Sequence, residues 1–330
     1  MINTKYKFCV VYITKDYYPM LDKCIYKYSK SNFHDIHVLN VDMGSTDENL
    51  EKGKQICEQL GIEMIDRKAN SMQEGLQIAN KYLDEQNIDV DWMISLQHDV
   101  FPLTETFWDD LQDIIDEIDT DKVGMISTNS FSNYNNGLKA LESDDLADAC
   151  IGKTKTSRGM LCTDILKSPY NGWYMNLPKE YYKCKYFAVE STYWSGFAIN
   201  RKLFQKYITV DPKYVFELWG DDLAYQFLAN GIINIAVPKL LVCHDHNLKK
   251  SIKINPGKLI EHRSDFNGPQ MRFWEKWGFR WGIRNPDVRT QFFNKNEKIY
   301  SKSTLQHKFF NLNINDGPLD IDLKTKAPSL

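Results

Sequence analysis

Histidines and carboxylates gather at two points of this sequence in combinations that can bind a divalent cation. The segment 97–100, Gln-His-Asp-Val, follows one apolar run, and 243–246, Cys-His-Asp-His, follows another. A hard cation that bridges phosphate groups needs one or two carboxylates, while phosphates and water complete its shell. Asp99 is therefore a candidate metal ligand, and His244 is a candidate second one. The opposing interpretation is that His98 and Asp99 only end a strand and cap the next helix.

A cation held by a carboxylate, an imidazole and diphosphate oxygens fits Mn²⁺ or Mg²⁺ better than Zn²⁺. The seven cysteines agree with this preference, because they form no C-x-x-C pair of the kind that binds structural zinc. Cysteines without a disulfide framework also favour a reducing compartment. Since no apolar run is long enough for a signal peptide or a membrane span, we expect a soluble, cytoplasmic protein.

Two further polar groups suggest substrate chemistry. In the turn 42–47, Asp42 could hydrogen-bond a nucleoside and Gly44 would let the backbone approach closely, although a plain turn before a helix explains the same residues. Asp221 and Asp222 open a predicted helix, where the helix dipole favours carboxylates. One of them could cap the helix while the other accepts a proton from a hydroxyl, unless both only cap. The sequence contains neither G-x-G-x-x-G nor a P-loop motif, which argues against ordinary dinucleotide or P-loop chemistry.

The elements that must position these groups follow from hydrophobic patterning. Buried strands are predicted at 8–13, 36–41, 62–65 and 91–96, separated by helices over 19–30, 47–60 and a segment that starts with a capping box at Ser71 and Glu74. This alternation predicts an α/β fold with a mostly parallel sheet flanked by helices. The carboxyl ends of such strands share one edge of the sheet, so the polar groups should converge there.

The remainder of the chain is less regular. A helix is predicted over 104–119 and another over 217–229, with strands at 123–126, 193–199, 232–236 and 240–242. Residues 128–187 show no clear period and are interpreted as a functional loop region or a small excursion from the fold. The basic, aromatic segment 249–308 is interpreted as a pair of helices that pack on the rest of the chain, although it could contact an anionic membrane or a lipid-linked acceptor. From Asp316 onwards we expect a loosely attached tail.

Bulk composition narrows the class of protein. With 330 residues, 42% of them hydrophobic, the chain can form one large or two modest domains with a real core. Its formal net charge of −3 gives the molecule no reason to coat nucleic acid. Composition does not predict an oligomeric state.

On these motifs the chain resembles the GT-A glycosyltransferases, the family-2-like branch in particular, over roughly residues 6–280. In the first half, the motifs that carry the resemblance are the opening strand with Thr14, the turn 42–47, the segment from Asn70 to Asn80, and His98-Asp99 at the place of the family's D-x-D motif. In the second half they are the segment 194–201 and the segment 219–223 at the place of the family's Glu-Asp acceptor-side motif. His244 stands at the family's late metal-binding position, and 273–278 stands in the place of its Lys-Trp-Gly ending.

The resemblance implies a Rossmann-like GT-A catalytic domain over 1–250, with a nucleotide-sugar-binding half at 1–101, an acceptor-binding half at 102–250 and a C-terminal helical extension at 251–330. It implies a hexosyl or pentosyl transferase that moves a sugar from a nucleotide-diphosphate-sugar, a UDP-sugar first of all, to the hydroxyl of a glycan acceptor. The implied reaction inverts the anomeric carbon, depends on a divalent metal and serves polysaccharide or glycoconjugate synthesis, although the sequence does not exclude retention.

The resemblance also implies a role for each motif residue. Asp42 would hold the base or ribose, Asp99 with His244 would bind the metal, and Asp222, with Asp221 beside it, would be the general base. The residues implied at the donor site are Thr14, Asp16, Asp42, Asn70, His98 and Asp99. The aromatic residues implied as acceptor platforms are Trp173, Tyr174, Trp194 and Trp219.

One departure from the family pattern keeps alternatives open. Gln97 stands where the family has the first aspartate of its metal motif, so the diphosphate could be neutralised partly by cations such as Lys249, Arg263 or Arg272. The same departure is the best support for a non-catalytic carbohydrate-binding or scaffold protein on a transferase fold. A sugar nucleotidyltransferase is a further alternative, but residues 14–17 are not the Gly-rich loop that such enzymes need after the first strand.

Overall fold

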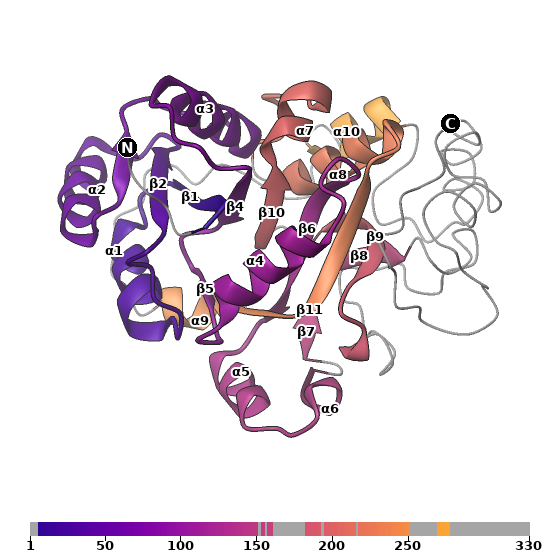
Figure 1. The fold of residues 1–330 in the computed structure, drawn as a ribbon. Helices are drawn as coiled ribbons and strands as arrows, with labels where there is room; N and C mark the ends of the chain where they lie inside the picture. The colour runs from indigo at the N-terminus through magenta and orange to yellow at the C-terminus, as the bar shows by residue number, and fades with distance from the viewer. Residues whose placement is uncertain are drawn as a thin grey trace.

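One central β-sheet organises the fold, and the computed structural model describes it together with the helices on its faces (Figure 1). The described residues are 6–150, 153–155, 157–160, 182–192, 195–215, 217–250, 252 and 269–277. The strands are β1 (Phe8–Thr14), β2 (His37–Asp42), β3 (Glu63–Ile65), β4 (Trp92–Leu96), β5 (Val100–Pro102), β6 (Val123–Phe131), β7 (Thr154–Lys155), β8 (Ser157–Met160), β9 (Phe187–Thr192), β10 (Gly196–Asn200) and β11 (Ile233–His244). The helices are α1 (Tyr18–Asp22), the π-helix η1 (Lys23–Tyr28), α2 (Asp47–Leu60), α3 (Met72–Glu85), α4 (Phe107–Glu117), α5 (Tyr134–Leu141), α6 (Leu146–Cys150), α7 (Arg201–Tyr207), α8 (Trp219–Ala229), α9 (His246–Lys250) and α10 (Pro269–Trp277).

The strand order along the sheet is β3-β2-β1-β4-β10-β6-β11-β9-β8, while β5 pairs with β11 and β7 with β6. The first four strands in the chain are parallel, as the sequence predicts. In the second half β6 and β11 are parallel, but β10 is antiparallel to both of its neighbours. The predicted α/β class is therefore confirmed, with a parallel first half and a mixed second half.

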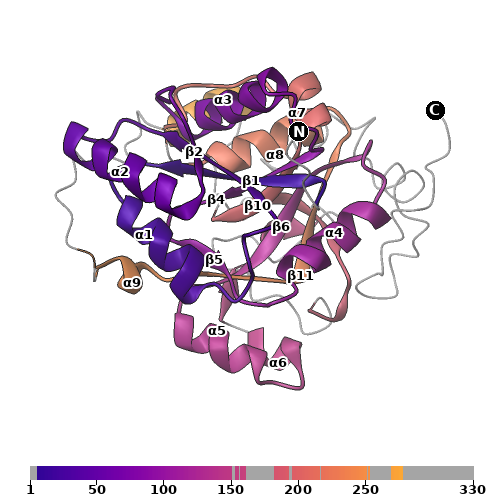
Figure 2. The ribbon, with the colours of Figure 1, turned by 60° about the vertical axis from the view of Figure 1, so that its left-hand side comes forward.

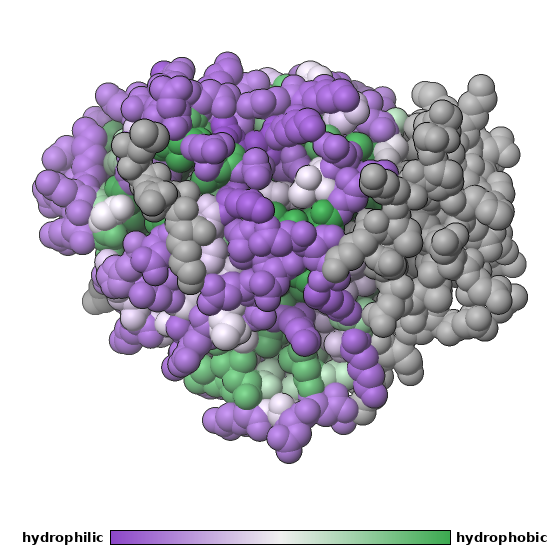
Figure 3. All heavy atoms as spheres, in the orientation of Figure 1, coloured by the Kyte–Doolittle hydropathy of each residue, from purple (hydrophilic) through white to green (hydrophobic). Residues whose placement is uncertain are grey.

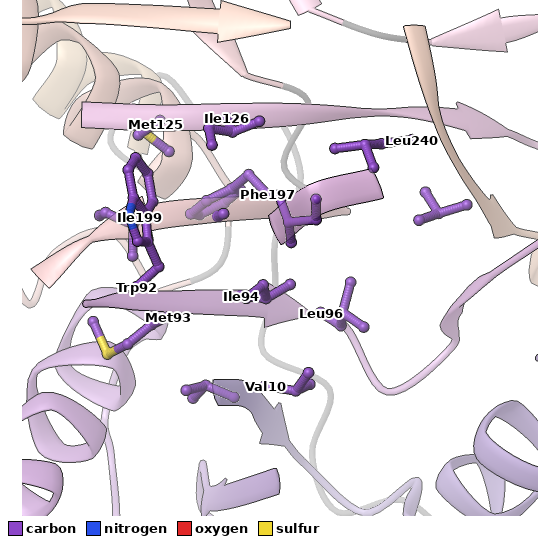
Figure 4. Packing of buried hydrophobic residues seen from close by; sticks show 14 of the residues in the cluster. Val10, Trp92, Met93, Ile94, Leu96, Met125, Ile126, Phe197, Ile199 and Leu240 are labelled. Carbon is purple, nitrogen blue, oxygen red and sulfur yellow. The ribbon is translucent and has the colours of Figure 1, made fainter. Parts of the chain in front are cut away.

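Helices cover both faces of this sheet, which explains why its central strands are apolar on both sides (Figures 1 and 2). On one face Trp108 of α4 packs against Phe8 of β1, and on the other Arg201 of α7 bonds to Asn80 of α3. Figure 4 shows the core between them, where apolar side chains from β1, β4, β10 and β6 pack together. Burial of each large apolar side chain contributes roughly 1.5–3 kcal/mol.

The ends of the predicted helices agree with local capping chemistry. Thr46 accepts a hydrogen bond from Asn49 N–H at the start of α2, and Gly61 ends that helix with φ of 68°. Ser71 accepts a hydrogen bond from the N–H of Glu74 at the start of α3, as the predicted capping box requires. The helix predicted over 19–30 differs, because after Asp22 it widens into the π-helix η1.

The second half of the fold departs further from the predictions. The stretch predicted to lack a pattern contains α5, α6, β7 and β8, and β6 runs on into it as far as Phe131. The two strands predicted at 232–236 and 240–242 are one strand, β11, with an irregularity between Ala236 and Leu241. Pro238 lies in this irregularity, where it cannot donate to the ladder, and its carbonyl accepts from Asn129 Nδ2 at 3.0 Å.

The described surface is mostly polar. Figure 3 shows a hydrophilic face with an apolar area towards the lower edge, where α5 and α6 lie, and Leu141 at the end of α5 is 38% exposed. None of the described helices combines the length and the apolar character that crossing a bilayer requires. The tail predicted from Asp316 lies outside the described residues.

Candidate active site

A short antiparallel pairing brings Asp99 and His244 together. Residue 99 lies between β4 and β5, and β5 pairs with the end of β11 so that Val100 stands opposite His244. His244 Nε2 lies 3.4 Å from Asp99 Oδ1, and each side chain is only 2% exposed. The proximity that the sequence analysis expected for these two residues is thus observed.

His246 joins this pair from the start of α9. Its Nδ1 lies 3.7 Å from Asp99 Oδ2, its side chain is 66% exposed, and its ring centroid lies 4.3 Å from that of His244. The three residues each offer one ligand atom, and these atoms lie within 4.8 Å of one another. Asp245 instead accepts hydrogen bonds from the N–H groups of Tyr134 and Asn247. His246 was not predicted as a ligand, because it lies beyond the end of β11, at the start of α9, and approaches Asp99 only in the folded structure.

The donor set of this metal-ligand cluster (Asp99, His244 and His246) suits a divalent cation. Two buried thiols lie near it, and burial, followed by the charge of Asp99, raises the pKa of Cys24 well above its usual value. Burial is also the main reason why the pKa of Cys243 is raised, with Asp245 and Asp99 adding to it. Neither cysteine is among the three residues whose ligand atoms lie within 4.8 Å of one another. One carboxylate and two imidazoles remain, a set that fits Mn²⁺ and similar ions.

Polar residues at the ends of β1 and β2 bond mainly to one another. The hydroxyl of Thr14 donates to Asn40 Oδ1 at 2.7 Å, and both residues are buried. Asp16 adopts a positive φ of 62° and accepts from the N–H of Thr46 at 2.8 Å, so it ties the loop after β1 to the start of α2. These two predicted donor-site residues thus fix the ends of β1 and β2, and their contact with a donor stays a prediction.

Asp42 organises the turn after β2. Its carboxylate accepts from Gly44 N–H at 2.8 Å, from the Ser45 hydroxyl and from the Tyr18 hydroxyl at 2.9 Å. Burial, followed by the neighbouring charge of Asp42, raises the pKa of Tyr18, so this phenol stays a donor. Contact between Asp42 and a nucleoside stays a prediction.

The two other predicted donor-site residues differ in surroundings. His98 lies outside the metal-ligand cluster, and its ring is stacked on that of Tyr17 with centroids 5.3 Å apart and an interplanar angle of 8°. Asn70 is exposed, and its N–H and its side-chain amide both donate to the carboxylate of Glu74. Tyr17 was not predicted as a site residue, because only the folded loop places it against His98.

Asp222 lies at the centre of a second buried network. Its side chain is fully buried, and its two oxygens accept from Gln73 Nε2 at 3.0 Å, Gln226 Nε2 at 2.8 Å, Lys276 Nζ at 2.9 Å and Trp277 Nε1 at 2.9 Å. All four partners donate, which suits an ionised carboxylate because it can only accept. The network joins α3, α8 and α10, which Figures 1 and 2 show in the same part of the molecule.

The neighbours of Asp222 in α8 and before it have other roles. Asp221 is buried and accepts from the hydroxyl of Ser191 at 2.7 Å. Trp219 is fully buried with its ring 5.1 Å from that of Phe197, so it packs in the core here, and its contact with an acceptor stays a prediction. Burial raises the pKa of Glu217, which lies two residues before the start of α8.

Several predicted residues cannot be placed. The acceptor candidates Trp173, Tyr174 and Trp194 lie outside the described residues, and so do Arg263 and the side chain of Lys249. Arg272 is described, and its Nε donates to Asp211 Oδ2 at 2.5 Å. This cation is thus engaged on α10, beside the Asp222 network.

Comparison with known proteins gives likenesses of structure only. Neither a protein-family model nor a curated protein sequence matches the chain. Among solved structures, the mannosyltransferase PcManGT from Pyrobaculum calidifontis in complex with GDP-Man and Mn²⁺ is 11% identical with a TM-score of 0.46. GalNAc-T7 with UDP, GalNAc and Mn²⁺ is 13% identical with a TM-score of 0.49, and TarS of S. aureus is 12% identical with a TM-score of 0.43.

These matches cover 73%, 73% and 72% of this chain, which in turn spans 57%, 44% and 36% of the three solved chains. Likenesses at this level of identity and TM-score concern the fold and do not establish a function. The case for a function rests on the metal-ligand cluster and the Asp222 network.

Proposed function

We propose that this chain is a glycosyltransferase that moves a sugar from a nucleotide-diphosphate-sugar to a hydroxyl of a glycan acceptor. The observation that carries the proposal is the metal-ligand cluster of Asp99, His244 and His246 beyond the carboxyl end of β4. In α/β sheets, ligands collect outside the carboxyl ends of the strands. A carboxylate and imidazoles at that point suit a cation that also binds diphosphate oxygens.

The donor half of the proposed site would hold the nucleotide sugar. Asp99, His244 and His246 would bind Mn²⁺ or Mg²⁺, and a bound cation would neutralise negative charge on the leaving diphosphate. Because Asp99 and His244 are 2% exposed and already in contact, little reorganisation is needed for them to act together. The turn after β2 and the loop after β1 would surround the nucleoside, with a UDP-sugar as the first donor to test.

Asp222 is proposed as the general base that takes the proton of the acceptor hydroxyl in a single in-line displacement with inversion. Its position in the first turn of α8 and its four donating partners support an ionised side chain. An acceptor hydroxyl would have to replace one of those donors, and Lys276 and Trp277 of α10 are the two that come from the C-terminal extension.

The proposed division into a donor half (1–101), an acceptor half (102–250) and an extension (251–330) fits this arrangement. Gln73 comes from the first part and Lys276 from the third, and both bond to Asp222 of the second. The extension would therefore complete the acceptor side of the site. Action in glycan biosynthesis, a cytoplasmic location and peripheral contact with a membrane belong to the same proposal.

The test is release of nucleoside diphosphate from UDP-, GDP- and dTDP-sugars, and of CMP from CMP-sugars, each with Mn²⁺, with Mg²⁺ and with EDTA. A thermal-shift screen of the same donors chooses the substrate, because a ligand of the native state raises the melting temperature. Metal-dependent release that disappears in Asp99→Asn supports the proposal. Glycan binding without release from any donor would instead identify a non-catalytic carbohydrate-binding protein.

A further inference from the structure

A fully buried glutamine of α3 ties Asp222 to a distant backbone segment. Gln73 Nε2 donates to Asp222 Oδ2 at 3.0 Å and to the carbonyl of Trp219 at 3.0 Å. Its Oε1 accepts from the N–H of Asp211 at 2.9 Å. Because a backbone N–H can only donate, this last bond fixes which end of the amide faces Asp222.

A second glutamine repeats the arrangement from α8. Gln226 Nε2 donates to the same Asp222 Oδ2 at 2.8 Å and to the carbonyl of Thr209 at 3.1 Å. Its Oε1 accepts from the N–H of Thr209 at 2.8 Å, so the orientation of this amide is fixed as well. Two amides from two helices therefore converge on one carboxylate oxygen, and each is held by the segment 209–211.

The other oxygen of Asp222 has different neighbours. Trp277 Nε1 donates to Oδ1 at 2.9 Å, and Lys276 Nζ lies 2.9 Å from each of the two oxygens. Both residues belong to α10 and are partly exposed, whereas Gln73 and Gln226 are buried. The Oδ2 side of the carboxylate is thus held by two buried amides, and the Oδ1 side faces the partly exposed Trp277 of α10.

We propose that Gln73 and Gln226 are positioning residues that fix Asp222 through Oδ2 and leave Oδ1 as the oxygen that accepts the proton of the acceptor hydroxyl. This inference rests on the proposed function of Asp222 as the base. A general base must be held within hydrogen-bond reach of its proton and in one orientation. Two amide donors on Oδ2 restrain rotation of the carboxylate, and the acceptor hydroxyl then takes the place of Trp277 Nε1 at Oδ1.

The test replaces each amide by a carboxylate of the same shape, in Gln73→Glu and in Gln226→Glu. A carboxylate at either position puts an acceptor against Oδ2 where a donor stood, so Asp222 turns away or holds a proton. We expect kcat to fall at least about tenfold in each variant. The donor KM should stay within about twofold, and the acidic limb of the pH profile should move to higher pH, because Asp222 must lose its proton before it can accept another.

Gln77→Glu is the matched control, because Gln77 lies one turn further along α3 and is partly exposed. It makes the same chemical change and should leave kcat and the pH profile as in the wild type. If Gln73→Glu fails to fold, Gln73→Leu removes the donor without adding charge and should lower kcat with an unchanged donor KM.

Two failures are distinguishable. If the wild-type chain releases no nucleoside diphosphate or CMP from any donor, the proposed function fails and the positioning role fails with it. If the wild type is active but both glutamate variants keep its kcat and its pH profile, the positioning role alone is wrong. A fall in the melting temperature with wild-type kinetics would likewise reduce both glutamines to structural residues.

Discussion

The metal-ligand cluster and the Asp222 network each centre on a buried carboxylate, but the side chains around the two carboxylates differ in kind. In the cluster, a carboxylate and two imidazoles point their ligand atoms at one another within 4.8 Å. In the network, one carboxylate meets four donors, two of them fixed by backbone bonds. Ligand atoms that all offer lone pairs gain most from a shared cation, whereas the network is satisfied by the protein itself. The cluster is therefore expected to respond to metal and the network to acceptor.

The largest effect should come from the network. Asp222→Asn keeps the size of the side chain but cannot accept a proton, so acceptor-dependent turnover should fall about 10³-fold, within the usual range for loss of a general base. Metal binding, measured by calorimetry with Mn²⁺, should stay as in the wild type, because the metal-ligand cluster is unchanged. Steady-state assays over a range of acceptor concentrations provide the kinetic measurement.

Asp221→Asn is the matched control for this substitution. Asp221 is as deeply buried, but it accepts a hydrogen bond from the hydroxyl of Ser191, and an amide oxygen can accept that bond too. Turnover should therefore fall much less than in Asp222→Asn. The reverse order of the two effects would assign the base to Asp221 and would remove the functional reason for the network.

How far the sequence predicts the fold depends on whether the signals are local. The first half follows from apolar runs and from caps such as Thr46, Ser71 and Gly61, whose chemistry acts within a few residues. The sequence pattern predicts two strands over residues that form the single strand β11, and Pro238 lies at the irregularity between them. The side-chain amide of Asn129, far away in the sequence, donates to the carbonyl of Pro238 at 3.0 Å, and no local pattern shows this bond.

The same distinction applies to the candidate site. The proximity of Asp99 and His244 could be predicted because both residues stand at strand ends, where α/β sheets gather their ligands. The partners of Asp222 could not be predicted in that role, because Gln73, Lys276 and Trp277 lie in the segments 70–80 and 273–278 that carry the resemblance but reach Asp222 only when α3 and α10 pack against α8. Residues that hold a functional group in place are therefore the part of a site that sequence patterns reveal least.

The metal-ligand cluster should show the next largest effect. Asp99→Asn removes the only carboxylate of the cluster, so affinity for Mn²⁺ should fall by at least about 100-fold, since outer-shell changes alone cost 10–100-fold. Calorimetric titration of the purified chain measures it. His98→Gln is the control, because His98 is adjacent in sequence but stacks on Tyr17 outside the cluster. Equal losses in the two variants would contradict the proposed ligand set.

His246 differs from Asp99 and His244 because it is the exposed member of the cluster. Its side chain is 66% exposed and its Nδ1 lies 3.7 Å from Asp99, the longer of the two distances to that carboxylate. His246→Ala should therefore lower Mn²⁺ affinity by about tenfold, less than Asp99→Asn, because water can replace an exposed ligand. In a thermal-shift titration the midpoint should move to higher Mn²⁺ concentration. An unchanged midpoint would remove His246 from the proposed ligand set and leave Asp99 and His244 as its members within the described part of the chain.

The smallest effect concerns the attachment of α10 to the network. Burial raises the pKa of Asp211, but the hydrogen bond from Arg272, with smaller contributions from the Lys213 N–H and from nearby cations, outweighs it and leaves this pKa below the usual value of 3.8. A carboxyl group whose pKa is lower in the folded chain than in the unfolded chain stabilises the folded state at pH values above the unfolded pKa. This stabilisation is lost as the pH falls through the folded pKa. Asp211→Asn should therefore cost about 1 kcal/mol, or roughly 2–4 °C, at pH 5 to 7.

The difference between wild type and Asp211→Asn should shrink only below about pH 4, where the wild-type carboxylate also takes up a proton. Thermal melts of both chains across this range measure it. Asp121→Asn is the control, because Asp121 pairs with Lys202 at a site where the two side chains are 70% and 75% exposed, and such pairs contribute little. A stability difference that disappears between pH 7 and 5 would mean that another group, and not Asp211, fastens α10 beside Asp222.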